Sequence, residues 1–244
     1  FLIAAIYMAP AFDGKVIQQG DTLKWQAMAK EQIDFHEKTG GHTLWNSSMF
    51  SGMPGYQITT GVKGHALFTG VKKFLNLAFA GLSGNVGAIF LYLIGFYVCL
   101  LAMGLNPWLS LLGAVTFGLG SYNIIIIEAG HMTKAFALAM MAPILGGMLL
   151  IFRRNYVWGG ILFAVALCTQ VAYNHIQITY YSMLAGVLLG LVYAIYAVKD
   201  KAIKPFLIGV GVLLIGCVFA VACNASNLFM NQEYAKYTMR GGSE

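Results

Sequence analysis

Ionisable side chains collect in a polar stretch from Asp13 to Asn85, and within it Asp21 is the strongest candidate for chemistry. Asp21 stands directly before a helical pattern, where an Asp is a favoured N-cap. An acid at this place could equally act as a general base. The sequence leaves both interpretations of Asp21 open. Asp13 precedes Gly14 and is typical of an ordinary turn.

A second group of polar side chains follows the third apolar segment of the chain. Glu128 and His131 are three residues apart, so they share one face if a helix continues through them. They could bind a divalent cation, or His131 and Lys134 could hold a phosphate. Alternatively, Glu128 simply ends a helix in the headgroup layer. Hard cations prefer several oxygen ligands, and the sequence places few here, so the metal stays unknown.

A third group, Asn174 and His175, lies between the fifth and sixth apolar segments. A single His at a membrane interface is commonly a structural residue held by hydrogen bonds. However, antiparallel packing of the segments would bring this connection close to Glu128 and His131. We therefore expect His175 to join the phosphate-binding residues, and Asn174 and Glu128 to contact substrate.

Aromatic and amide side chains in the polar stretch are candidates for binding a sugar. Trp45, Asn46 and Tyr56 could stack on a sugar ring and hydrogen-bond to its hydroxyls. In the alternative interpretation, Trp45 and its apolar neighbours Met49 and Phe50 dip into the lipid interface.

Composition determines the class of protein that must position these residues. Of 244 residues, 59% are hydrophobic and 10% are charged, whereas soluble domains carry about 25% charged residues. This composition predicts a polytopic membrane protein. The formal charge of +6 does not suggest nucleic acid, because five of the fifteen basic residues sit in two short connections.

A membrane span needs roughly 20 mainly apolar residues. The stretches that qualify are 1–12, truncated at its start, and 86–104, 108–127, 135–152, 156–173, 178–198 and 205–223. We expect one all-α transmembrane bundle over residues 1–244, as part of a longer protein. Placing the basic connections around Arg153 and Lys201 inside puts the 13–85 loop outside.

The outer loop is expected to carry two helices. The first runs from Asp21 to about Lys38 and ends in a glycine C-cap at Thr39-Gly40-Gly41. Met53-Pro54-Gly55 favours a turn with Pro and Gly at its centre. A second, amphipathic helix over 64–80 would lie in the membrane surface. The sequence lacks a Walker A loop, GxSxG, HExxH and GxGxxG, so neither ATP-driven transport nor soluble-type hydrolysis has support.

Several of these segments together resemble the YfhO family of bacterial multi-pass membrane proteins in its Bacteroidetes form. The segments that carry the resemblance are Asp21 at the start of the loop helix, Leu44-Trp45-Asn46, Phe50-Ser-Gly-Met-Pro54, Glu128-Ala-Gly-His-Met-Thr-Lys134, Asn174-His-Ile-Gln-Ile-Thr-Tyr-Tyr181 and Glu233-Tyr-Ala-Lys-Tyr-Thr-Met-Arg-Gly-Gly-Ser-Glu244. The resemblance covers essentially the whole chain.

The resemblance implies the GT-C glycosyltransferase superfamily, with a seven-helix module, surface helices in the first outer loop and a catalytic Asp at the position of Asp21. It implies a polyprenyl-phosphate-linked sugar as donor and a cell-envelope glycan or lipid as acceptor, at the bacterial cytoplasmic membrane. No Asp-X-Asp or Asp-Glu pair stands at Asp21, which puts a metal-dependent variant in doubt. The alternative function is a transporter or flippase for a lipid-linked sugar.

Overall fold

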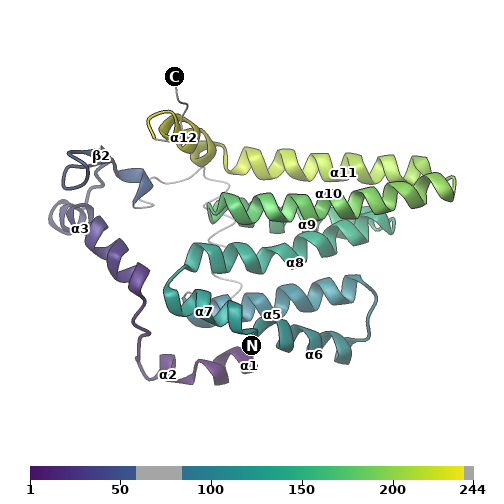
Figure 1. Cartoon of the computed structure of the whole chain (residues 1–244), viewed down its shortest axis with the longest axis horizontal. Helices are drawn as coiled ribbons and strands as arrows, with labels where there is room; N and C mark the ends of the chain where they lie inside the picture. Colours follow the sequence, from purple (N-terminus) through teal and green to yellow (C-terminus); the bar gives the residue numbers. More distant parts are fainter. Residues whose placement is uncertain (59–83, 239–244) are drawn as a thin grey trace.

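The computed structural model describes residues 1–58 and 84–238, and this part of the chain is predominantly helical (Figure 1). Its elements are α1 (Leu2–Tyr7), α2 (Ala9–Phe12), α3 (Gly20–Thr39), β1 (Trp45–Asn46), β2 (Met53–Pro54), η1 (Gly55–Gln57), α5 (Asn85–Ala102), α6 (Pro107–Gly118), α7 (Ser121–Ala129), α8 (Met132–Phe152), α9 (Tyr156–Ala172), α10 (Ile176–Lys199), α11 (Ile203–Cys223) and α12 (Ala225–Ala235).

The apolar composition appears in the structure as membrane-length helices. Among the described residues, α5, α8, α10 and α11 are each long and apolar enough to cross a bilayer, and α9 is a shorter apolar helix of 17 residues. The pair α6 and α7 could form a fifth span. These helices confirm the prediction of an all-α, multi-pass membrane protein.

The predicted single span over 108–127 is wrong in one respect, because the chain bends by 44° between α6 and α7. The break leaves the carbonyl oxygen of Phe117 to accept from Gly120 N at 3.1 Å and from Asn123 Nδ2 at 2.7 Å. A buried amide therefore satisfies a backbone group that the bend removes from the helical ladder. The expected first span is also divided, into α1 and α2, and Pro10 lies at the start of α2.

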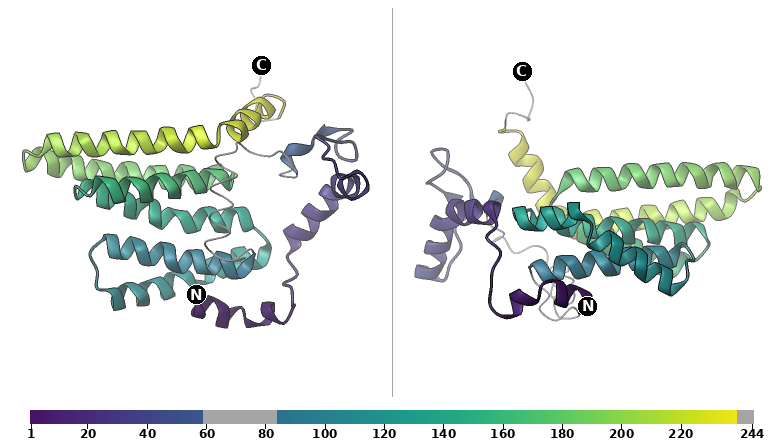
Figure 2. Two further views of the ribbon diagram at one scale, coloured as in Figure 1. Left: turned by 180° about the vertical axis from the view of Figure 1, so that it is seen from behind. Right: turned by 60° about the horizontal axis from the view of Figure 1, so that its bottom comes forward.

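Helix α8 forms the centre of the bundle and packs against α5, α7, α9, α10 and α11. In the most apolar 18-residue segment of α8, 61% of the residues are buried, compared with 17% in that of α10 and 22% in that of α11. The last two helices therefore lie at the edge of the bundle, where Figures 1 and 2 show them with little covering on one side. Their exposed Val, Leu and Ile side chains suit contact with lipid.

Small residues allow the central helices to approach closely. A Cβ atom on Gly159 of α9 would lie 2.7 Å from the backbone nitrogen of Ile151 in α8. Between α5 and α8, a Cβ atom on Gly95 would lie 2.7 Å from the carbonyl oxygen of Ala139. Pro143 leaves this oxygen without its usual helical N–H donor. Glycine packing of this kind is characteristic of membrane helices.

The connections after α5, α8 and α10 gather at one end of the bundle, which we call the basic end (residues 103–106, 153–155 and 199–204). Arg153 Nη1 donates to the carbonyl oxygen of Ala102 at 2.7 Å, and the Tyr156 hydroxyl donates to that of Pro205 at 3.1 Å. The two basic connections therefore lie on the same side, as the sequence predicts. Which face of a membrane this end occupies stays a prediction.

The opposite end, the polar end, carries α3, the α7–α8 and α9–α10 connections and α12 (Figure 1). The predicted loop helix is confirmed as α3, with Gly40 in the left-handed conformation (φ 67°) at its C-cap. The turn predicted at Pro54 is wrong, because Met53 and Pro54 pair with Asn46 and Trp45 in an antiparallel hairpin. The predicted helix over 64–80 lies outside the described residues.

Candidate functional site

Asp21 of α3 and His131 of the α7–α8 connection meet at the polar end. The carboxylate oxygen Oδ2 of Asp21 lies 2.8 Å from His131 Nδ1, and Oδ1 lies 3.6 Å from Lys24 Nζ. The N-cap of α3 is Gln19, so the interpretation of Asp21 as a helix cap is wrong. Both side chains of the pair stay partly open to solvent, at 41% for Asp21 and 49% for His131. The pair therefore joins two elements and remains accessible to a ligand.

Gln19 fixes the start of α3 against the bundle. Its side chain is buried, and its Nε2 donates to the carbonyl oxygen of Ile127 at 2.6 Å and to Asn85 Oδ1 at 3.0 Å. Its Oε1 accepts from the hydroxyl of Thr22 at 2.9 Å. One amide thus connects α3, α5 and α7 directly beside Asp21.

Gly130 explains why His131 lies next to α3. It ends α7 in the left-handed conformation (φ 88°), and His131 N donates to the carbonyl oxygen of Ile126 at 3.1 Å, the helix-stop pattern known as a Schellman motif. A Cβ atom on Gly130 would lie 3.0 Å from Gln19 Cβ and 3.1 Å from Thr22 N. Only glycine combines this backbone angle with so close an approach.

His175 and Lys134 lie near the pair and complete a group of basic side chains. Burial lowers the pKa of His175 below its usual value of 6.5, and the nearby charges of Lys134 and His131 lower it further. Nε2 of His175 is buried and has no hydrogen-bond partner in the described part of the chain. Lys134 Nζ lies 5.4 Å from the ring centroid of Tyr122, within range of a cation–π interaction.

Phe136 and Tyr173 hold the two connections together, because their rings stack with centroids 4.8 Å apart. This contact places the first turn of α8 beside the end of α9, where His175 follows. The arrangement brings three basic side chains opposite one carboxylate. Such a group can hold an anion such as a phosphate, in which a buried imidazole N–H or a lysine ammonium donates to the oxygens.

The structure does not bring Glu128 into this group. Glu128 is exposed at the end of α7, and within residues 1–58 and 84–238 it makes no ion pair with His131. In the same residues, no three His, Cys, Asp or Glu side chains come together as metal ligands. The predicted cation site between Glu128 and His131 is therefore not formed by the described residues.

Asn174 and Tyr56 both contact α12. Asn174 adopts the left-handed conformation (φ 55°), and its Oδ1 accepts from Asn231 Nδ2 at 2.6 Å. The ring of Tyr56 meets that of Tyr234 edge to face, with centroids 6.5 Å apart. Helix α12 thus links the α9–α10 connection to the outer loop, a role that the sequence alone did not suggest.

Trp45 and Asn46 differ in what they can still bind. Asn46 is fully buried, where Nδ2 donates to the carbonyl oxygen of Met28 at 2.9 Å and Oδ1 accepts from the Ser48 hydroxyl at 2.7 Å. Its predicted contact with a sugar does not fit, because its hydrogen bonds hold the hairpin on α3. Trp45 is 52% exposed and remains available.

A scan against protein-family models, a search of curated proteins and a search of solved structures found no match to this chain. The resemblance to the YfhO family therefore stays a prediction, and the function must be argued from the geometry of the polar end.

Proposed function

We propose that this chain is the membrane-embedded part of a GT-C-type glycosyltransferase related to the YfhO family. It would transfer a sugar from a polyprenyl-phosphate donor to a cell-envelope acceptor at the polar end, on the outer side of the bacterial cytoplasmic membrane. The contact between Asp21 and His131 carries the proposal, since it places a carboxylate from the outer loop against the membrane helices. The described residues contribute four helices that could each cross a membrane, or five if α6 and α7 form one span, and the seven-helix module is part of the proposal.

In the proposed reaction, an acceptor hydroxyl attacks the anomeric carbon of the sugar and gives its proton to the carboxylate of Asp21. The bond between the anomeric carbon and the lipid phosphate breaks, and the phosphate leaves with the electron pair. His131 Nδ1–H donates to Oδ2 of Asp21, which leaves Oδ1 to take the proton. A positioned base contributes typically ~10²–10⁴-fold to the rate.

The same pair permits a second division of roles. Because Asp21 accepts from Nδ1, it can orient the imidazole so that Nε2 of His131 takes the proton. In that case Asp21 is a positioning residue and His131 is the base. In both versions Lys134 and His175 are expected to hold the departing phosphate, whose negative charge grows as the bond breaks.

A labelled polyprenyl-phosphate sugar, incubated with the protein in detergent and a cell-envelope acceptor extract, tests the proposal. Asp21→Asn should lower label transfer by about 10²–10⁴-fold, the value of a positioned base. Asp34→Asn is the matched control, because Asp34 lies on the same helix, is 40% exposed and pairs with Lys30 at 3.0 Å. Unchanged transfer by Asp21→Asn would disprove the assignment.

His131→Gln distinguishes the two roles. If Asp21 is the base, this variant retains more transfer than Asp21→Asn, because the carboxylate is still present. If His131 is the base, both variants lose transfer to a similar extent. The transfer rates are compared only for variants that elute from a size-exclusion column at the same volume as the parent protein, since these variants are folded.

A lipid-linked sugar transporter is the second candidate, and the bend between α6 and α7 favours it. Discontinuous helices often form the substrate sites of transporters. In proteoliposomes a transporter would move labelled donor across the bilayer without transferring its sugar, and Asp21→Asn would leave that movement unchanged. An enzyme would give labelled acceptor instead.

A further inference from the structure

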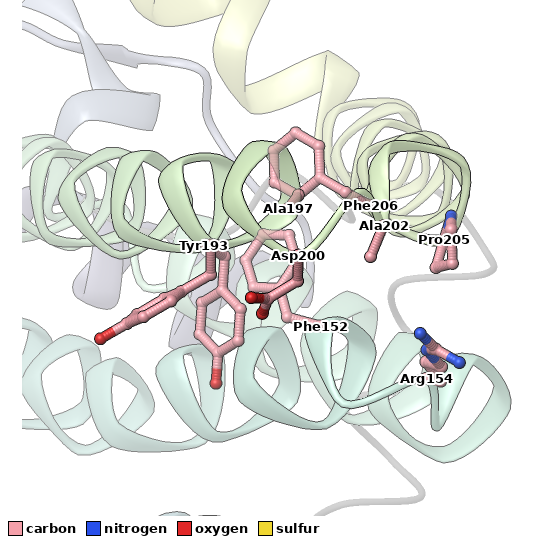
Figure 3. Close-up of a pocket in the computed structure, with 9 residues that line it drawn as sticks. Phe152, Arg154, Tyr193, Ala197, Asp200, Ala202, Pro205 and Phe206 are labelled. Carbon is pink, nitrogen blue, oxygen red and sulfur yellow. The ribbon is translucent and has the colours of Figure 1, made fainter.

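A cavity of about 280 Å³ lies at the basic end, far from the candidate site at the polar end (Figure 3). It is formed where α8 and α10 end and α11 begins. The lining residues are Phe152, Arg154, Tyr193, Tyr196, Ala197, Asp200, Ala202, Pro205 and Phe206. Small-molecule sites usually measure about 300–1,000 Å³, so this cavity suits a compact group rather than a large cofactor.

Three stacked rings form one wall of the cavity. The ring of Phe152 from α8 lies 4.7 Å from that of Tyr193 on α10 and 5.6 Å from that of Phe206 on α11, measured between centroids. Because Phe152 is stacked on both sides, the three helix ends are held together and the wall is apolar. The hydrogen bond from Tyr156 to Pro205 supports the same junction.

Two opposite charges line the cavity from different connections. Arg154 follows α8 and Asp200 follows α10, and Figure 3 shows both side chains at the cavity. Across the described residues, no ion pair within 4.0 Å involves either of them. Each charge is therefore available to a ligand.

The height of the cavity along the helices indicates what it binds. It lies at the end of helices that are long enough to cross a bilayer, which is the level of lipid headgroups. The surrounding connections carry five basic side chains and one acidic one, namely Arg153, Arg154, Lys199, Lys201, Lys204 and Asp200. Basic pockets between membrane helices at this level are suited to phosphorylated lipid headgroups.

We propose that this cavity binds the headgroup of a glycerophospholipid that carries an N–H or O–H donor in addition to its phosphate. Arg154 binds the phosphate, Asp200 accepts the hydrogen bond from the ammonium or hydroxyl group, and the stacked rings contact the glycerol and upper acyl chains. Phosphatidylethanolamine and phosphatidylglycerol have such donors, whereas phosphatidylcholine has none. The site is independent of the proposed glycosyltransferase activity.

Native mass spectrometry of the detergent-purified protein tests the proposal with short-chain forms of these three lipids. Losing a hydrogen bond to a charged group lowers affinity about tenfold. The parent protein should bind the ethanolamine and glycerol lipids about tenfold more tightly than the choline lipid. Arg154→Gln should weaken both about tenfold, and Asp200→Ala, which removes the acceptor, should abolish the preference over choline.

Lys204→Gln is the matched control, since it removes one positive charge from the same end without touching the cavity lining. It should change binding less than twofold. Equal losses in Arg154→Gln and Lys204→Gln, or equal binding of all three lipids by the parent protein, would overturn the proposal. Inorganic phosphate that binds as tightly as the ethanolamine and glycerol lipids would overturn it too, because a soluble anion would then be the ligand. Asp200 is exposed, so Asp200→Ala provides a test even where Arg154→Gln does not fold.

Discussion

Replacing Gly130 with Ala should detach the start of α3 from the membrane helices. Gly130 has φ 88°, and a new Cβ atom would lie 3.0 Å from Gln19 Cβ, 3.1 Å from Thr22 N and 3.1 Å from Thr22 Oγ1. All three atoms belong to backbone or to a side chain held by other hydrogen bonds. The neighbouring helix start must therefore move by a few tenths of an ångström.

Two terms contribute to the expected loss. A left-handed conformation costs a non-glycine residue about 1–2 kcal/mol, and overpacking adds about 1–3 kcal/mol. The first term acts within the α7–α8 connection alone. The second opposes the docking of α3, so the opening of its first turn should become favoured by about 1–3 kcal/mol. That corresponds to roughly fivefold to more than a hundredfold faster amide exchange when exchange follows the opening equilibrium.

Hydrogen exchange of the purified protein, followed by mass spectrometry of peptides that cover the start of α3, measures this effect. Gly40→Ala is the matched control, because Gly40 also has a left-handed φ of 67° but nothing lies within 4 Å of its Cβ position. The control should leave the first turn of α3 unchanged. Equal exchange in Gly130→Ala and the parent protein would show that the contact does not hold α3.

Three further perturbations test other parts of the structure. Glu31 accepts from the amides of Ser47 and Ser48, which lowers its pKa below the usual 4.5, so the protection of these amides should be present above that pH and lost as the pH falls. Glu31→Gln should speed their exchange at neutral pH and remove the pH dependence. Burial lowers the pKa of His175 below 6.5, so the neutral imidazole favours the folded state above that pH. An anion at the polar end favours the charged imidazole, so its binding should be accompanied by proton uptake. Sulfate should therefore bind to the parent protein more tightly as the pH falls below about 6.5. The affinity of His175→Gln for sulfate should not change in this way. An affinity of the parent protein that is independent of pH would contradict the prediction. Gln170 is fully buried and donates to a carbonyl oxygen of α8 and to a hydroxyl of α10, so Gln170→Glu should destabilise the bundle by about 2–3 kcal/mol. A thermal midpoint in detergent no lower than that of Gln170→Met would contradict this.

The sequence predicts the membrane helices well, because a long apolar segment has few alternatives to a helix in lipid. The limits of α5, α8, α10 and α11 fall close to the predicted ones. The break after Gly118 was missed, although Gly118, Gly120 and Ser121 interrupt the apolar run at this point. Asn123 is the residue that could have indicated the break, because its side-chain amide donates to the carbonyl oxygen of Phe117 at the bend.

The candidate site was predictable in its members but not in its contacts. The sequence places His131 and His175 at the same end, but the helix stop at Gly130 was not predicted, because Glu128 and His131 were considered as neighbours on a continuing helix. However, the partner of His131 lies 110 residues earlier in the chain, and no local pattern could identify it. Gln19 was missed for the same reason, because its acceptors lie 66, 108 and 113 residues away.

The proline within α8 has a mechanical consequence for the polar end. Pro143 removes one backbone hydrogen bond near the middle of the central helix, where Gly95 lets α5 pack closely against it. His131 lies 12 residues before it, about 18 Å along the helix at 1.5 Å per residue. A tilt of about 10° at this soft point would displace the imidazole by about 3 Å, which is as far as a proton donor and acceptor are apart. A bend at Pro143 would therefore change the distance between the Asp21 carboxylate and the His131 imidazole.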